Sequence, residues 1–146
     1  MTIGMYNDLS EEEQIQLVTS DRRLLKHIDR PSEAVQIAAV RQQMSSLTDI
    51  IDGNYAIRWI ENPSEAVQLA AINAEVYVLK YIKEPSEAVQ LAAVQIYAPY
   101  IQYINNPSEA VQLAAVQKYP DSIIYINNPS DELKAYANLL KLGKKQ

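Results

Sequence analysis

The 146-residue chain has no cysteine and a single histidine, His27. The lack of cysteine excludes disulfide frameworks, thiolate zinc sites and cysteine nucleophiles, and one histidine excludes metal motifs that need two. No apolar run approaches the roughly 18 residues that cross a membrane, and no charged segment followed by an apolar one predicts a signal peptide. The three glycines form no phosphate-binding pattern. We therefore expect a cytoplasmic protein with no metal, cofactor or membrane contact.

Basic residues are fewer than acidic ones, 13 against 18, and the formal net charge is −5. A protein of this charge is not attracted as a whole to nucleic acid or to anionic membranes, so any such attraction must be local. Hydrophobic residues make up 48% of the chain and charged residues 21%, which is typical of a globular protein. A chain of this length is long enough to bury a core as one domain.

The motif Pro-Ser-Glu-Ala-Val-Gln starts at Pro31, Pro63, Pro85 and Pro107, and a divergent copy starts at Pro129. Residues 9–30 align with the same unit. Self-similarity at a fixed period, here 22 residues, indicates a repeat architecture. We predict one domain, residues 1–146, built from the units 9–30, 31–62, 63–84, 85–106, 107–128 and 129–146. Three units share the stretch Pro-Ser-Glu-Ala-Val-Gln-Leu-Ala-Ala, which indicates recent duplication or a consensus sequence.

Each unit is predicted to form two short helices. The first begins at the Pro-Ser-Glu motif, capped either by the preceding asparagine (Asn62 or Asn106) with Glu at the third helical position or, in another register, by the serine. The second is shorter, for example residues 121–127. Its inward stripe is predicted from two columns three residues apart. These columns are Leu25, Ile57, Leu79, Ile101 and Ile123, and Ile28, Ile60, Ile82, Ile104 and Ile126.

Two units depart from the regular pattern. The 31–62 unit has ten extra residues within 41–52, which either lengthen its first helix or form an added short helix. The added element is either a neutral insertion or a protruding contact for a partner. In the last unit the second helix is missing, and the first is predicted to continue to a stop at Gly143.

The string Asn-Pro-Ser-Glu-Ala-Val-Gln-Leu-Ala-Ala-Val at residues 106–116 resembles the Asp-Pro-x-x-x-Val-Arg-x-Ala-Ala opening of HEAT repeats. The units are shorter than most HEAT repeats and have Gln where those have Arg. Short repeats of this kind are also similar to those of uncharacterised bacterial and phage proteins. The resemblance covers residues 9–146. It implies an all-α, right-handed α-solenoid of two-helix repeats that serves as a binding scaffold, with no catalytic residues to carry over.

The second helices carry the candidate binding surface, on the face expected to lie opposite the isoleucine stripe. Every unit has an aromatic ring at one column, and aromatic and arginine side chains often anchor protein interfaces. The candidate partner-binding residues are Tyr55, Arg58, Trp59, Tyr77, Lys80, Tyr81, Tyr103 and Tyr125. The basic half of the strip is a candidate contact for single-stranded or duplex nucleic acid, through Arg22, Arg23, Lys26, His27, Arg30 and Lys83. The alternative for the tyrosines is a structural role, half-buried between helices.

Two polar columns have structural interpretations. The glutamines Gln14, Gln36, Gln68, Gln90 and Gln112 are expected to hydrogen-bond between stacked helices or to the preceding loop, with a polar recognition strip as the alternative. The glutamates of the first helical turn suit the helix dipole. His27 is expected to be a solvent-facing residue and not a general base. The sequence thus predicts a monomeric, non-enzymatic protein-binding adaptor or inhibitor, with nucleic-acid binding as the alternative.

Overall fold

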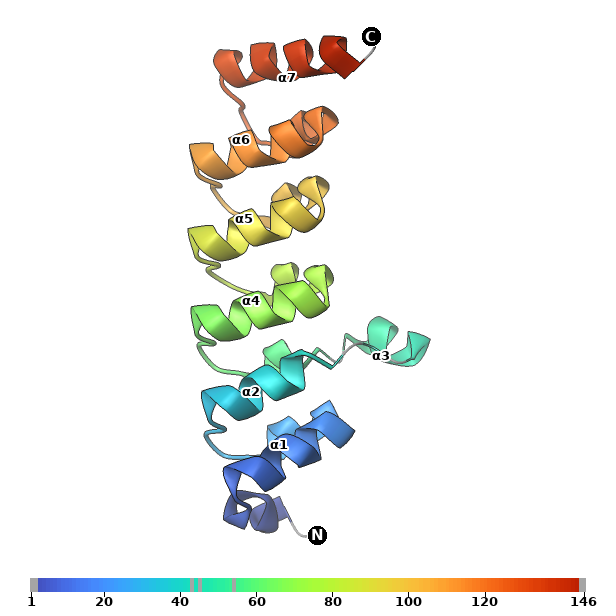
Figure 1. The fold of residues 1–146 in the computed structure, drawn as a ribbon, viewed down its shortest axis with the longest axis vertical. Helices are drawn as coiled ribbons and strands as arrows, with labels where there is room; N and C mark the ends of the chain where they lie inside the picture. The colour runs from blue at the N-terminus through green and yellow to red at the C-terminus, as the bar shows by residue number, and fades with distance from the viewer. Residues whose placement is uncertain (1–2, 43, 45, 54, 145–146) are drawn as a thin grey trace. The chain divides into compact units, whose positions relative to one another are not determined.

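The computed structural model describes residues 3–42, 44, 46–53 and 55–144 (Figure 1). Over these residues the secondary structure is entirely helical, as the sequence predicts. The chain divides into two compact units, Met1–Ile82 (unit 1) and Lys83–Gln146 (unit 2).

Unit 1 alternates α-helices with short 3₁₀ helices. Its α-helices α1, α2 and α4 lie side by side (Figure 1). Its elements are η1 (Ile3–Asp8), α1 (Glu11–Ser20), η2 (Arg22–His27), α2 (Glu33–Val40), α3 (Leu47–Asp52), η3 (Ala56–Trp59), α4 (Glu65–Ala74) and η4 (Val76–Tyr81).

Unit 2 repeats the same alternation and closes on a longer helix. Its elements are α5 (Glu87–Ile96), η5 (Ala98–Tyr103), α6 (Glu109–Lys118), η6 (Pro120–Tyr125) and α7 (Asp131–Lys144). Helix α7 continues through the predicted stop at Gly143 and ends one residue later. This confirms that the first helix of the last unit is extended.

The second helix of each repeat is a 3₁₀ helix. For example, η6 covers Pro120–Tyr125, where the sequence predicts a helix over 121–127. A 3₁₀ helix has three residues per turn, so residues three apart lie on one line. This geometry suits the two inward columns. Ile28, Ile60, Ile82, Ile104 and Ile126 are all buried, and in the other column only Ile123 is half-buried.

Serine, and not asparagine, caps the first helices. In the Ser64 cap the backbone is extended and Oγ accepts a hydrogen bond from the N–H of Val67 at 3.3 Å, and Ser108 caps α6 in the same way. Asn62 and Asn106 instead adopt a left-handed φ of 52° and 50°, which asparagine tolerates better than most residues. The asparagine-cap register is therefore wrong and the serine register is confirmed.

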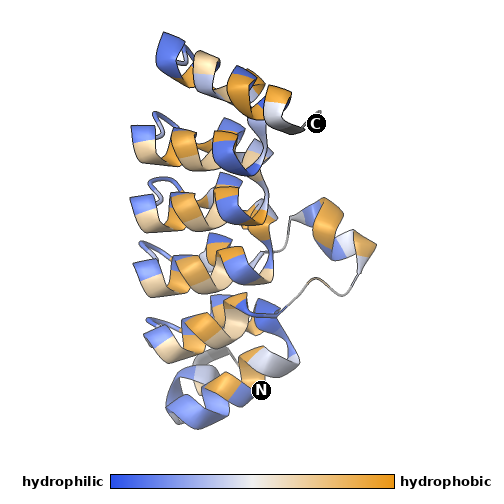
Figure 2. Cartoon of the chain, turned by 45° about the horizontal axis from the view of Figure 1, so that its top comes forward, coloured by the Kyte–Doolittle hydropathy of each residue, from blue (hydrophilic) through white to orange (hydrophobic). Residues whose placement is uncertain are grey.

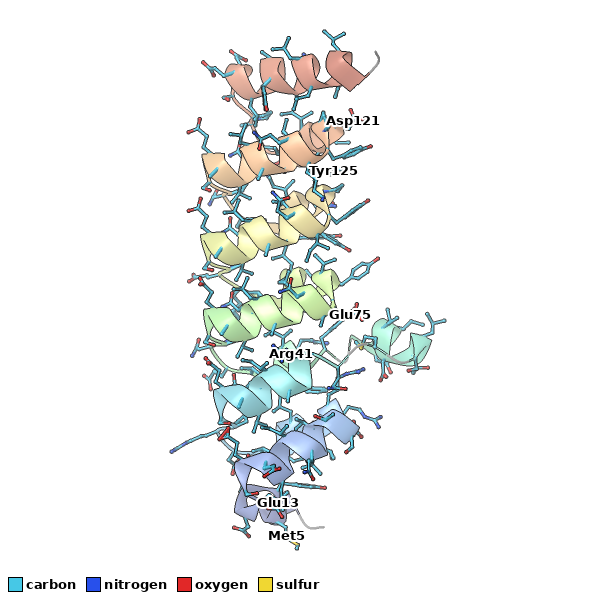
Figure 3. The ribbon with its side chains drawn as sticks, viewed as in Figure 1. Met5, Glu13, Arg41, Glu75, Asp121 and Tyr125 are labelled. Carbon is cyan, nitrogen blue, oxygen red and sulfur yellow. The ribbon has the colours of Figure 1, made fainter. Side chains whose placement is uncertain are left out.

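Because serine is the cap, the third helical position of these repeats is valine and no capping box forms at Glu65. Among the helices whose caps are described, a complete capping box forms only between Ser10 and Glu13; Asp49 at the third position of α3 is also acidic but does not complete one. The Ser10 N–H donates to Glu13 Oε2 at 2.8 Å and holds the pKa of Glu13, labelled in Figure 3, below its usual value.

The ten-residue insertion forms the added helix α3. Figures 1 and 2 show α3 projecting from unit 1, away from α2. It begins at a Ser46 cap and ends at Gly53, which has a left-handed φ of 62°. Its apolar residues Leu47 and Ile51 are more than 70% exposed.

Candidate functional site

In unit 1 the predicted strip is a cluster of cations over aromatic rings. The Lys26 Nζ lies 5.9 Å from the Trp59 ring centroid. The Arg58 Cζ and the Lys80 Nζ each lie 5.0 Å from the Tyr81 ring centroid. A cation over a ring face is attracted by the ring quadrupole. None of the three cations forms an ion pair with another residue that the structure describes, so their charge is available to a ligand.

The end of the insertion fixes Arg58 above Tyr81. The Arg58 Nη1 donates to the Gly53 carbonyl at 2.8 Å. A Cβ atom at position 53 would lie 3.0 Å from both Arg58 Nη1 and Tyr81 Oη. Glycine suits this position because it adopts the left-handed backbone without strain and leaves space for both side chains.

Two residues predicted for the exposed strip are buried instead. Tyr55 is 7% exposed and its ring lies 5.3 Å from that of Tyr81. Arg22 is 8% exposed, and its Nη2 lies 3.2 Å from Asp49 Oδ2 on α3 and 2.7 Å from Met44 Sδ. The placement of both on the exposed face is wrong. Arg22 contacts Met44 and Asp49 of the insertion, and its counterparts Ala98 and Pro120 in unit 2 are buried as well. Burial raises the pKa of Tyr55, and the carboxylate of Glu75 (labelled in Figure 3) adds to the rise.

The remaining basic residues of the strip have separate environments. Arg23 is exposed, but its Nε and Nη2 donate to Asp21 at 2.9 and 2.8 Å, so the charge is already paired. These hydrogen bonds lower the pKa of Asp21 and raise that of Arg23. His27 is half-buried and stacks on Tyr6 at a centroid distance of 6.0 Å. Arg30 is exposed with a left-handed φ of 52°.

In unit 2 the strip is aromatic and nearly uncharged. The ring centroids of Tyr97 and Tyr100 lie 5.2 Å apart, and those of Tyr100 and Tyr103 lie 5.4 Å apart. Tyr100 is buried while its two neighbours are about half exposed. The predicted residue Tyr125 is exposed on η6 beside Ile124, which is 72% exposed (Figure 3). Lys83 is exposed at the start of this unit.

Sequence reasoning missed Tyr97 and Tyr119, both about half exposed. They stand at the junction between the first and second helices of their repeats. In unit 1 the same column holds Asp21, Gly53 and Glu75, so aromatic residues do not recur along it. The available signal is local: Tyr97, Tyr100 and Tyr103 are spaced by three residues, the period that aligns side chains on a 3₁₀ helix.

The glutamine column has the structural role that the sequence predicts, by hydrogen bonds to the preceding loop. The Gln36 Nε2 donates to the Pro31 carbonyl at 2.8 Å, five residues earlier. The same bond recurs at 2.9 to 3.0 Å for Gln68, Gln90 and Gln112. The Gln14 Nε2 donates to the Tyr6 carbonyl at 3.0 Å instead. These bonds hold each Pro-Ser-Glu loop against its helix.

Among the described residues, no three acidic or histidine side chains are grouped so that they could hold a metal ion. Likewise, none of the helices described there has the length and apolar character needed to cross a membrane. No protein-family model, curated protein or solved structure matches the chain.

Proposed function

We propose that the protein is a non-catalytic cytoplasmic scaffold, either an adaptor or an inhibitor. It binds a partner protein through the strip on its 3₁₀ helices. In this proposal the two-helix repeats form a right-handed α-solenoid. The side-by-side packing of first helices within each unit supports this proposal. So does the exposure of the same second-helix position in successive repeats, for example at Arg58, Lys80 and Ile124.

The observation that carries the proposal is the exposed aromatic surface of unit 2. Tyr97, Tyr103, Tyr119 and Tyr125 are each between 38% and 54% exposed, and Ile124 extends the surface. Tyrosine supplies large contact area with a polar tip, which suits a surface that is wet when free and buried when bound. Clustered exposed apolar and aromatic groups mark interaction sites.

Site-specific photo-crosslinking in cells tests this proposal. A photo-reactive residue at position 124 of the full chain is expected to capture a discrete protein partner. The same residue at position 134, which is exposed on α7 outside the strip, is the matched control. The captured band should disappear in the Tyr97→Ala/Tyr103→Ala variant. A yield at position 124 no higher than at position 134 would show that the strip is not the binding surface.

A second candidate, single-stranded nucleic-acid binding, is favoured by the unpaired cations of unit 1. Lys26, Arg58 and Lys80 surround the rings of Trp59 and Tyr81, and a basic track beside rings is the usual platform for single strands. Fluorescence anisotropy with labelled single-stranded RNA and DNA at low and moderate salt tests it. Binding that weakens with salt and in Arg58→Ala/Lys80→Ala would support this candidate. No binding at low salt would eliminate it.

A further inference from the structure

A groove of about 450 Å³ lies between α6 and α7 in unit 2, and its lining includes none of the strip residues. Its volume falls within the range of ligand pockets. Its apolar lining comes from Ala110 and Leu113 on α6 and from Leu133 and Tyr136 on α7. Two acidic residues, Glu109 and Glu132, also line it.

The groove is open because α7 carries large side chains where α2, α4, α5 and α6 carry alanine. Glu132 and Tyr136 stand at the repeat positions that Ala110 and Ala114 occupy in α6. Small residues let two helices approach closely, and larger ones at the same positions keep α7 away from α6. As a result Leu113 is 39% exposed, whereas its counterpart Leu91 is half-buried.

A serine–glutamate hydrogen bond joins two of the helix pairs described within the units, and neither the α1–α2 pair nor the α6–α7 pair has one. The Ser108 Oγ donates to Glu87 Oε1 at 2.7 Å between α5 and α6, and the Ser64 Oγ donates to Glu33 Oε2 at 2.6 Å between α2 and α4. No such bond joins Glu109 to Ser130, although both residues are described. The Tyr136 hydroxyl instead accepts a hydrogen bond from Gln117 Nε2 at 3.3 Å, which holds its ring at the groove wall.

Among the residues that the structure describes, the groove lining carries negative charge and no cation. Glu109 and Glu132 are exposed, and neither side chain forms a hydrogen bond or an ion pair with another residue in the described part of the chain. No lysine or arginine lines the groove. The amino ends of α6 and α7 would attract an anion, but the carboxylates of Glu109 and Glu132 already occupy the first turns of these helices. An acidic ligand would be repelled, and a basic one attracted.

We propose that this groove binds a short segment of a partner protein in which aliphatic anchors are flanked by lysine or arginine. One anchor packs against Leu113, Leu133 and Tyr136, and the flanking cations pair with Glu109 and Glu132. The charge complementarity sets the specificity for a basic segment over an acidic one. This site is distinct from the aromatic strip, so it does not rest on the function proposed above.

Titrations followed by ¹H–¹⁵N NMR on the full chain test the proposal. The probes are two end-capped tetrapeptides, Lys-Leu-Leu-Lys and Glu-Leu-Leu-Glu. The lysine peptide is expected to shift the amides of Leu113, Leu133 and Tyr136 saturably, with an affinity about tenfold higher than that of the glutamate peptide. Equal binding of the two peptides, or no saturable shift at these amides, would overturn it. So would shifts at these amides that grow with protein concentration alone, because they would assign the groove to a second copy.

Two variants separate a binding role from a structural one. Glu109→Gln/Glu132→Gln removes both charges from exposed positions and should lower the affinity for the lysine peptide about fivefold to tenfold while the rest of the spectrum stays unchanged. Glu87→Gln is the matched control, since it removes one acid of the same column that is already bonded to Ser108. An equal loss in the control, or unaltered binding in the double variant, would show that the groove acids do not select the ligand.

Discussion

Units 1 and 2 use the same repeat but present different surfaces. Residues 1–82 hold seven basic and twelve acidic residues, whereas residues 83–146 hold six of each. The strip of unit 1 places cations over two half-buried rings. The strip of unit 2 leaves uncharged rings at the surface. The comparison shows that the repeat sets where the second-helix columns lie, while the residue at each column sets the chemistry.

The insertion is the second difference between the units. In unit 1 it contacts Arg22 through Met44 and Asp49 and holds Arg58 through the Gly53 carbonyl. Unit 2 has no insertion, and its aromatic residues at the helix junctions, Tyr97 and Tyr119, are exposed. The insertion thus gives the strip of unit 1 contacts that unit 2 does not have.

The largest expected effect is on the free energy of unfolding, from truncating one residue of the same inward column in each unit. Leu79 in unit 1 is 1% exposed, whereas Ile123 in unit 2 is half-buried. We expect Leu79→Ala to lower the free energy of unfolding by about 2–5 kcal/mol, and Ile123→Ala by less than half of that, because its removal leaves a smaller cavity. Urea unfolding followed by circular dichroism measures both. Equal losses would mean that the column packs alike in the two units.

A pair of glycine substitutions tests the role of the insertion. Gly53→Ala should lower the free energy of unfolding by about 1–2 kcal/mol, because the left-handed backbone and the atoms of Arg58 and Tyr81 oppose a Cβ there. Gly143→Ala in α7 meets no atom within 4 Å and should be neutral or raise stability by up to about 1 kcal/mol. Thermal melts of the two variants measure the contrast. A harmless Gly53→Ala would contradict the proposed fixing of Arg58.

The helix caps offer a matched comparison within unit 2. Ser108→Ala removes a cap and the hydrogen bond to Glu87, and should cost about 1–1.5 kcal/mol of unfolding free energy. Ser130→Ala removes only the cap on Leu133 N and should cost about 0.5–1 kcal/mol. Chemical denaturation of both variants measures the difference. If Ser130→Ala costs as much as Ser108→Ala, the α6–α7 pair is closed in the same way as α5–α6.

The smallest expected effect is the pH dependence of the Asp21–Arg23 pair in unit 1. Because the folded-state pKa of Asp21 lies below its usual value of 3.8, the pair stabilises the fold above that value, and the stabilisation is lost as the pH falls through the folded pKa. The pair is largely exposed, so solvent screens it and its contribution to the stability is small. The unfolding free energies of wild type and Asp21→Asn, measured between pH 7 and pH 2, should converge at the acid end. If the two unfolding free energies differ by a constant amount across this range, the charge of Asp21 is excluded as the source of the difference.

Sequence reasoning predicted the features that depend on residues close together in the chain. The inward isoleucines, the long last helix and the glutamine-to-loop bonds follow from a spacing of three to five residues within one repeat. The choice between asparagine and serine caps stayed open because both residues favour the amino ends of helices. It was decided by backbone angles, since Asn62 and Asn106 occupy the left-handed region.

The 22-residue spacing of the motif, the helical class and the buried stripe follow from the sequence alone, because they recur with a period visible along one chain. Which columns are exposed depends on the tertiary structure. Arg22 is buried beside Asp49 of the inserted helix. Leu113 is exposed in the groove that it lines together with Tyr136 of the following α-helix. Such burial depends on atoms brought together from distant segments, and no local period encodes that approach.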